Sequence, residues 1–81
     1  MPIKEKDRDV LFEITEHIGV IATTAAGWTK ELNLVSWNGA LAKYDIRDWS
    51  EDHEHMSHGI TFNWDELVEL RALLAEVEMK K

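Results

Sequence analysis

The sequence predicts an α+β domain in which four antiparallel strands are followed by one C-terminal helix, in the order ββββα. Two observations predict this fold. Segments rich in Ile, Val, Phe, Thr and Trp are separated by short turn signals, and residues 63–81 contain neither Gly nor Pro. A chain of 81 residues is expected to form a single domain with a thin core. The absence of cysteine excludes disulfides and thiolate metal sites, and is consistent with a reducing cytosol.

Four segments are predicted as strands, namely residues 10–24, 28–37, 43–50 and 60–62. Within the first of them, Gly19 is expected to mark a bulge or bend, because glycine interrupts regular strand pairing. The residues Ala25 to Gly27 are expected to form a turn. Asn38 and Gly39 then form the strongest short hairpin signal in the chain, because both residues tolerate positive φ. A polar loop separates the third strand from the fourth.

The C-terminal helix is expected to begin at Asn63 and to continue to Lys81. Glu66 lies three residues after Asn63, which gives a capping-box pair. Apolar residues occupy more than half of the helix circumference, whereas one sheet covers only a stripe. We therefore expect a second helix, from another copy of the chain, to pack against this one; the alternative is a broad stripe laid on a single sheet. The predicted homodimer interface comprises Leu70, Leu73, Leu74 and Val77.

The two ends of the chain bear on where the protein acts. Residues 1–9 alternate in charge and are expected to be a flexible segment, which leaves residues 10–81 as the functional domain. The N-terminus lacks the apolar segment of a signal peptide. No apolar run approaches the roughly 20 residues needed to span a bilayer. A soluble, cytoplasmic protein without a membrane partner is expected.

The formal net charge of −7 argues against a nucleic-acid partner when taken over the whole chain. Residues 27–50, however, are neutral, so the negative charge lies elsewhere. In the strand KYDIRDWS, alternation places Lys43, Arg47 and Trp49 on one side and Tyr44 and Ile46 on the other. Since the helix covers only one face of the sheet, we expect Lys43, Arg47 and Trp49 to lie on the other, open face.

Aromatic and cationic side chains together are the pattern of a single-stranded nucleic-acid interface, in which bases stack and cations follow the phosphates. The hairpin before the polar loop adds Trp28, Lys30 and Trp37 to this pattern. In a regular strand, Trp28 and Lys30 would point to one face of the sheet and Trp37 to the other, because successive side chains alternate. Either a bulge brings all three to one face, or Trp37 belongs to the core.

Two kinds of chemistry are weaker candidates. His53, His55 and His58 in the polar loop could ligate a metal, but their spacing matches no closed site, and a solvated loop is favoured. Serines 36, 50 and 57 lack the surroundings of a catalytic nucleophile, and no phosphate-binding glycine loop is present. We therefore expect no enzyme activity, cofactor, metal or small-molecule substrate.

The stretch from Lys43 onward resembles the positive cofactor 4 family of transcriptional coactivators, in particular its bacterial YdbC-like branch. The resemblance rests on Ile46-Arg47-Asp48-Trp49, a polar loop, Gly59-Ile60 and the acidic-capped helix from Asn63. The upstream segment GWTKELNLVSWN is similar to the same branch, and the likeness covers about residues 11–78.

The resemblance implies a curved antiparallel sheet, a homodimer formed through the helices, and binding of single-stranded DNA with little sequence preference. Single-stranded RNA is a second candidate ligand. Lys43 and Arg47 would contact phosphates and Trp49 would stack on bases, while Trp28 and Lys30 would extend the track. The role of Trp37 is left open. Transcription regulation and DNA replication or repair are the implied processes. Replacing Arg47 by alanine is expected to weaken binding without unfolding the domain.

The chain departs from the family pattern at Ser57 and His58, where the family usually carries lysine. This loss predicts weaker and strongly salt-sensitive binding. His58 could restore charge, because histidine in water gains a proton below about pH 6.5. The rival hypothesis is a protein-interaction module that keeps the fold with weak or no nucleic-acid binding, as the acidic net charge suggests.

Overall fold

The computed structural model describes residues 11–77 and confirms the predicted ββββα order. Its elements are β1 (Phe12–Thr23), β2 (Thr29–Trp37), β3 (Lys43–Trp49), β4 (Ile60–Phe62) and α1 (Trp64–Ala75). The flexible segment predicted over residues 1–9 lies outside the described residues, as do the last residues of the predicted helix.

The four strands form one antiparallel sheet in the order β1-β2-β3-β4. Pairing of β2 with β3 is continuous, with Thr29 opposite Trp49 and Val35 opposite Lys43. Pairing of β1 with β2 shifts register at three places, one of them between His17 and Gly19, which confirms the predicted irregularity at Gly19. The β2–β3 turn contains Asn38 and Gly39 at positive φ, as the sequence predicts.

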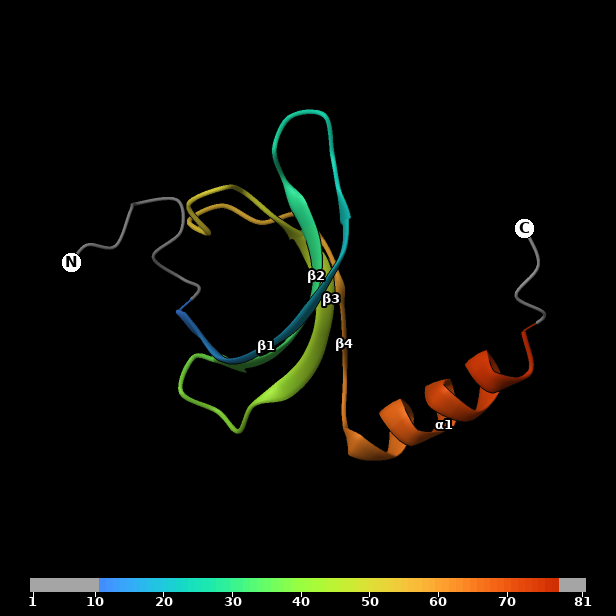
Figure 1. Ribbon diagram of the computed structural model, residues 1–81. Coiled ribbons are helices and arrows are strands. Elements are labelled where there is room, and N and C mark those ends of the chain that lie inside the picture. The colour runs from blue at the N-terminus through green and yellow to red at the C-terminus, as the bar shows by residue number, and fades with distance from the viewer. Residues whose placement is uncertain (1–10, 78–81) are drawn as a thin grey trace.

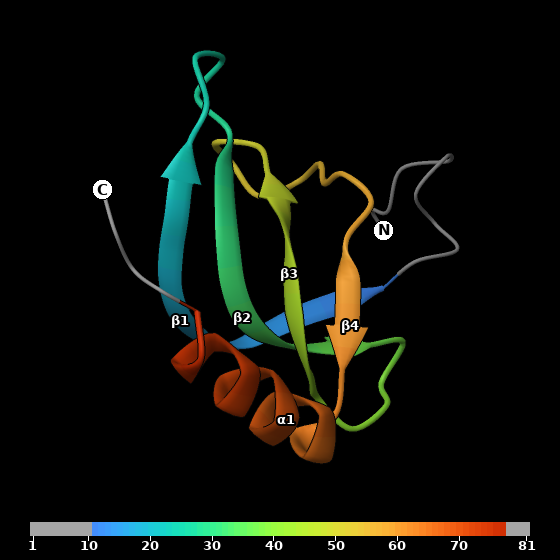
Figure 2. The ribbon, with the colours of Figure 1, turned by 90° about the vertical axis from the view of Figure 1, so that its right-hand side faces the viewer.

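The sheet curls strongly, so that it has a concave side and a convex side (Figure 1). The helix α1 follows β4 and lies on the convex side, running across the lower ends of the strands in Figure 2. The β1 strand bends across the sheet, so that its first residues approach the concave side. This curl decides which side chains are covered.

Helix α1 begins as predicted, because the Asn63 side chain and the Glu66 side chain form a reciprocal capping box. It ends at Ala75, earlier than expected, where the Glu76 N–H donates to the carbonyls of Leu73 and Leu74 and so tightens the last turn. None of its residues is buried. No helix within residues 11–77 is long and apolar enough to cross a bilayer.

The core is divided between the two sides of the sheet. On the convex side, the Tyr44 and Phe62 rings stack with centroids 6.2 Å apart, and Trp64 at the start of α1 lies 6.2 Å from Tyr44. On the concave side, the buried residues are Glu31, Asn33, Val35, Asp45 and Trp49. A core that contains two carboxylates and an amide is unusual, so their partners indicate what this side does.

Candidate nucleic-acid interface

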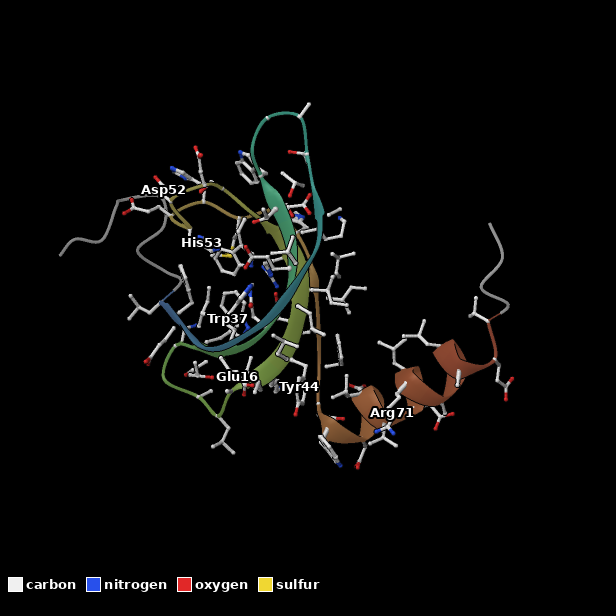
Figure 3. The ribbon with its side chains drawn as sticks, viewed as in Figure 1. Glu16, Trp37, Tyr44, Asp52, His53 and Arg71 are labelled. Atoms are coloured by element: carbon white, nitrogen blue, oxygen red, sulfur yellow. The ribbon has the colours of Figure 1, made fainter. Side chains whose placement is uncertain are left out.

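The concave face is defined here by the inward side chains of β2 and β3, which are Glu31, Asn33, Val35, Trp37, Asp45, Arg47 and Trp49. Figure 3 shows Trp37 and His53 inside the concavity and Tyr44 toward the convex side. The alternation predicted for β3 is therefore confirmed, with Arg47 and Trp49 on one side and Tyr44 on the other. Lys43 begins the same strand with the parity of Arg47 and is exposed.

Trp49 differs from the sequence expectation in its exposure. It was predicted on an open face, but its exposed fraction is 0%. The Phe12 ring covers it at a centroid distance of 5.1 Å, and the His53 ring stacks on it at 5.7 Å. The expectation of an open face is wrong because the sheet curls until its first strand and the loop after β3 both reach the concave face.

Arg47 is the most strongly held side chain of the concave face. Its Nε and Nη2 donate to the two carboxylate oxygens of Asp45 at 2.7 and 2.8 Å. Its Nη1 donates to the Met56 sulfur and to the Ser57 carbonyl. The guanidinium carbon lies 4.6 Å from the centroid of the Trp37 ring, a cation–π distance. Because the Asp45 side chain is 0% exposed, this pair neutralises much of the charge that Arg47 brings.

The structure also decides the parity question raised by the second strand. Trp37 lies on the concave face beside Arg47, and so shares the face of the predicted site. Lys30 lies on the opposite, convex side, where its Nζ contacts Asp48 at 3.0 Å. No bulge interrupts the β2–β3 pairing, so parity is kept along β2. Lys30 therefore lies on the other side of the sheet from Lys43 and Arg47.

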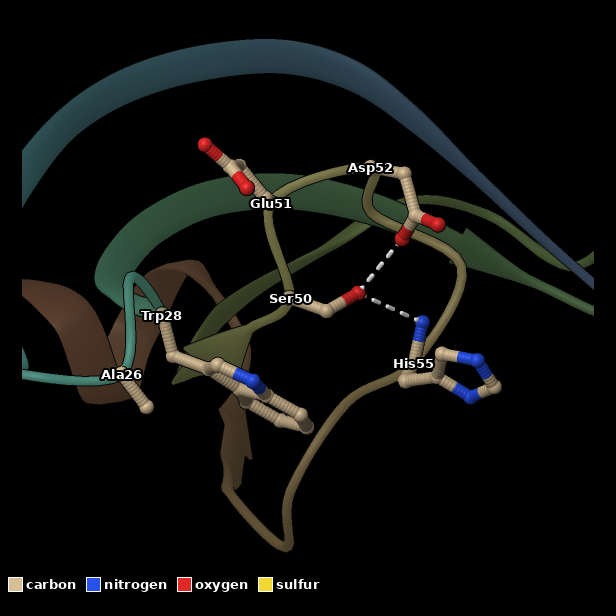
Figure 4. Close-up of a pocket in the computed structure, with 6 residues that line it drawn as sticks. All are labelled: Ala26, Trp28, Ser50, Glu51, Asp52 and His55. Atoms are coloured by element: carbon tan, nitrogen blue, oxygen red, sulfur yellow. Dashed lines mark hydrogen bonds between the residues drawn. The ribbon is translucent and has the colours of Figure 1, made fainter.

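Trp28 precedes β2 and lines a shallow pocket of about 310 Å³. The other lining residues are Ala26, Ser50, Glu51, Asp52 and His55 (Figure 4). Hydrogen bonds from the Glu54 backbone N–H and the Ser50 hydroxyl lower the pKa of Asp52 below its ordinary value of 3.8. The carboxylate is thus ionised at neutral pH, and its negative charge disfavours a phosphate beside Trp28.

The sequence reasoning missed a polar network at the centre of the concave face. Glu31, 3% exposed, accepts hydrogen bonds from the Asn33 amide at 3.0 Å and the Thr29 hydroxyl. Its carboxylate also contacts the His53 ring at 2.9 Å and the His17 ring at 3.5 Å. His17 from β1 contacts the Asn33 amide oxygen at 2.7 Å. The signal was present in TKELNLVSW, where Glu31 and Asn33 share the parity of Trp37.

These hydrogen bonds give Glu31 a pH-dependent role in stability. Burial opposes its ionisation, but the hydrogen bonds from Thr29, Asn33 and His53 outweigh burial and hold its pKa below the ordinary 4.5. A carboxyl whose pKa is lowered by folding stabilises the folded state above the unfolded pKa, and this contribution is lost as the pH falls through the folded pKa.

We predict that Glu31→Gln lowers the free energy of unfolding at pH 7, and that the difference from wild type shrinks below about pH 4.5. Urea denaturation at several pH values between 3 and 7 measures this difference. A difference that stays constant over the whole range would show that ionised Glu31 does not stabilise the fold.

The loop histidines do not act together. His53 contacts Glu31, His55 lines the Trp28 pocket, and His58 is exposed next to the start of β4. Within residues 11–77, no group of three His, Asp or Glu side chains is placed to hold a metal ion.

The predicted dimer residues are largely exposed apolar side chains. Leu73 and Leu74 of α1, and Val77 just after its end, are exposed by half or more, and Leu70 is half-buried. Other large apolar side chains are exposed as well, on β1, β4 and α1, namely Ile18, Val20, Ile21, Ile60, Trp64 and Val68. So much exposed apolar surface in a small domain is typical of an interaction surface.

Together these features define a class of protein: a small ββββα domain that carries aromatic and cationic side chains on the sheet side away from its helix. The family model of the transcriptional coactivator p15 (PC4) matches residues 24–73, more than half of the chain. The chain is also 42% identical over 71 residues to an uncharacterised protein of Treponema pallidum (strain Nichols), which covers 88% of this chain and 84% of that protein. The chain belongs to the PC4 family, whose members bind single-stranded DNA and act in transcription as coactivators and not as enzymes.

Proposed function

We propose that this protein binds single-stranded DNA on its concave face, without sequence preference, in transcription regulation or in DNA replication and repair. The observation that carries the proposal is the gathering of Trp37, Trp49, Arg47 and Lys43 on the one sheet side that the helix leaves free. Membership of the PC4 family supports the same function.

Each of these side chains has a distinct role in the proposed interface. Trp37 stacks on bases, and Trp49, which is 0% exposed in the free protein, does so once its cover moves. Each such stack typically contributes about 1–3 kcal/mol per base and tolerates any base. Arg47 is fixed by Asp45 against Trp37, so it positions the ring and reaches a phosphate only with reduced charge. Lys43 has no ion pair within residues 11–77 and is exposed, so it supplies a full charge at the rim.

The small number of cations sets the salt dependence. With Lys43 at full charge and Arg47 partly neutralised by Asp45, the logarithm of the binding constant should fall with the logarithm of salt concentration at a slope no steeper than about −1.4 per protomer, at about 0.7 per phosphate contact. This slope is shallower than the strong salt dependence expected from the sequence. Titration of tryptophan fluorescence with a dT oligonucleotide at several salt concentrations measures it.

Lysine variants provide the matched control for this titration. Lys43→Ala should weaken binding and reduce the slope by about 0.7, whereas Lys30→Ala, on the convex side, should leave both unchanged. Absence of binding by the wild-type protein even at low salt would refute the proposed function. The same titration with an rU oligonucleotide compares RNA with DNA.

We further propose that the protein is a homodimer whose partner covers the exposed apolar residues of α1. Leu73, Leu74 and Val77, the last just beyond α1, are 50–56% exposed, because α1 meets its own sheet chiefly at its first turn. A stable dimer buries an apolar core of this kind.

We predict that Leu74→Glu converts the dimer to a monomer, because it places a charge within the buried interface. Ala72→Glu introduces the same charge on the opposite side of α1 and should leave the dimer intact. Sedimentation velocity at micromolar concentration distinguishes the two states. A wild-type protein that sediments as a folded monomer would refute the dimer.

One observation favours a second function. The Asp45 carboxylate opposes Arg47, and Glu51 and Asp52 surround Trp28, so the described surface holds little positive charge. A protein-interaction module of the same fold would have these features. It becomes the better account if the low-salt titration shows no binding of DNA or RNA.

A further inference from the structure

We propose that Phe12 occupies the place of a nucleobase in the free protein, and that single-stranded DNA reaches the concave face by displacing the start of β1. We call residues 12–14 the strap. This inference rests on the proposed function, because it describes how the same face becomes available to its ligand.

The first argument is the position of the Phe12 ring. Its centroid lies 6.0 Å from the Trp37 ring and 5.1 Å from the Trp49 ring, tilted by 47° in each case. Trp37 ends β2, whereas Trp49 pairs with Thr29 at the other end of that strand. Phe12 therefore contacts two indoles that lie at opposite ends of the sheet. Its six-membered ring has the size of a pyrimidine base. Both contacts lie in the range of favourable aromatic pairs.

The second argument is that Phe12 leaves two hydrogen-bond donors unused. The indole Nε1 atoms of Trp37 and Trp49 are buried and have no hydrogen-bond partner among the described residues. Buried donors are almost always paired, so two such groups on the indoles that contact one phenyl ring require a reason. A phenyl ring has no acceptor, whereas nucleobases carry carbonyl oxygens and ring nitrogens along their edges. A base in place of Phe12 could accept from these groups.

The third argument is that the strap can leave without disturbing the rest of the sheet. β1 is an edge strand, and β2 is its only neighbour in the sheet described. Three residue pairs, beginning with Phe12 opposite Trp37, hold the strap before the first register shift, which follows Ile14. The adjoining Leu11 also exchanges two hydrogen bonds with Asn38, at 2.6 and 2.8 Å, and these must break when the strap leaves. A shift of register is a natural point for separation, because the hydrogen-bond ladder is already interrupted there.

The remaining cover of the concave face stays in place when the strap leaves. His53 stacks on Trp49, and its Nε2 contacts Glu31 at 2.9 Å. The loop after β3 is also held by the Ser57 hydroxyl, which accepts a hydrogen bond from the Asp48 N–H and donates one to the His58 carbonyl. Neither partner belongs to the strap. Displacement of Phe12 alone would therefore uncover the Trp37 and Trp49 edges that it contacts.

A removable disulfide tests the strap. Glu13 and Ser36 are directly opposite on β1 and β2, adjacent to the Phe12–Trp37 pair and on the other side of the sheet. Opposite residues of antiparallel strands have Cα separations suited to a disulfide. Because the chain contains no cysteine, Glu13→Cys with Ser36→Cys gives one defined bond that ties the strap down.

We expect the oxidised double variant to bind a dT oligonucleotide at least about tenfold more weakly than the same protein after reduction, because the binding-competent state becomes rare. The wild-type protein, titrated with and without reductant, is the control. Equal affinity of the oxidised and reduced forms, while both bind, would overturn the strap alone. Absence of binding by the wild type would overturn the proposed function and the strap with it.

Phe12→Ala gives an independent test. Removing the ring should strengthen dT binding several-fold, because no side chain then competes with the base. Leu11→Ala is the matched control, since Leu11 is adjacent and exposed, and it should leave the affinity unchanged. Circular dichroism establishes that both variants are folded. Unchanged or weaker binding by folded Phe12→Ala would overturn the inference.

Discussion

Replacing Arg47 by alanine should destabilise the domain by about 3–5 kcal/mol, because it leaves the carboxylate of Asp45 buried without its partner. The Asp45 side chain is 0% exposed, and Arg47, at 13%, donates two of its hydrogen bonds. The variant also removes the guanidinium from the Trp37 ring and from the Ser57 carbonyl. Denaturation in urea, followed by circular dichroism, measures the loss of stability.

Lys43→Ala is the matched control, because Lys43 lies on the same strand but has no ion pair within residues 11–77. This variant should change the free energy of unfolding by no more than about 0.5 kcal/mol. A cost for Arg47→Ala below about 1 kcal/mol would contradict the buried pair. The sequence alone suggested that Arg47 could be removed without unfolding the domain, and the structure changes that expectation. Loss of DNA binding in Arg47→Ala therefore does not by itself establish a DNA contact.

Replacing Gly59 by alanine should also destabilise the domain, by about 1–3 kcal/mol. A Cβ at this position would meet the Arg47 Cβ and the Ile46 carbonyl oxygen, closer than real Cβ atoms approach such neighbours. Because the Ile46 oxygen belongs to the backbone of β3, a side-chain rotation cannot relieve the overlap. The chain at the start of β4 would have to move away from β3.

Gly19→Ala is the matched control for this substitution. A Cβ at Gly19 meets nothing within 4 Å, so the variant should be as stable as wild type or up to about 1 kcal/mol more stable. Thermal denaturation of the two variants beside wild type makes the comparison. Equal melting temperatures for Gly59→Ala and Gly19→Ala would mean that β4 does not lie against Arg47 as described.

The parts of the fold that local signals encode could be predicted from the sequence. The hairpin at Asn38 and Gly39 and the capping box of Asn63 and Glu66 each depend on residues close together in the chain. The end of the helix could not be predicted, because no glycine or proline marks it. The curl of the sheet followed from the family resemblance and not from the pattern of the residues.

The candidate site was predicted only in part for a related physical reason. Alternation assigned Arg47 and Trp49 to one face, since strand geometry is local. The burial of Trp49 depends on Phe12, which lies far away in the chain and reaches it only because the sheet curls. The parity of Lys30 and Trp37 left open which of them shares the face of Arg47, and the structure places Lys30 on the convex side.

The most direct test of the concave face is the response of the four tryptophan indoles to DNA. In nuclear magnetic resonance spectra of the ¹⁵N-labelled protein, each indole N–H gives its own signal, and Trp64 on the convex side serves as an internal control. On addition of a dT oligonucleotide, we expect the Trp37 and Trp49 signals to shift and the Trp64 signal to stay. Shifts confined to Trp64, with Trp37 and Trp49 unmoved at saturating DNA, would contradict the proposal that DNA binds the concave face.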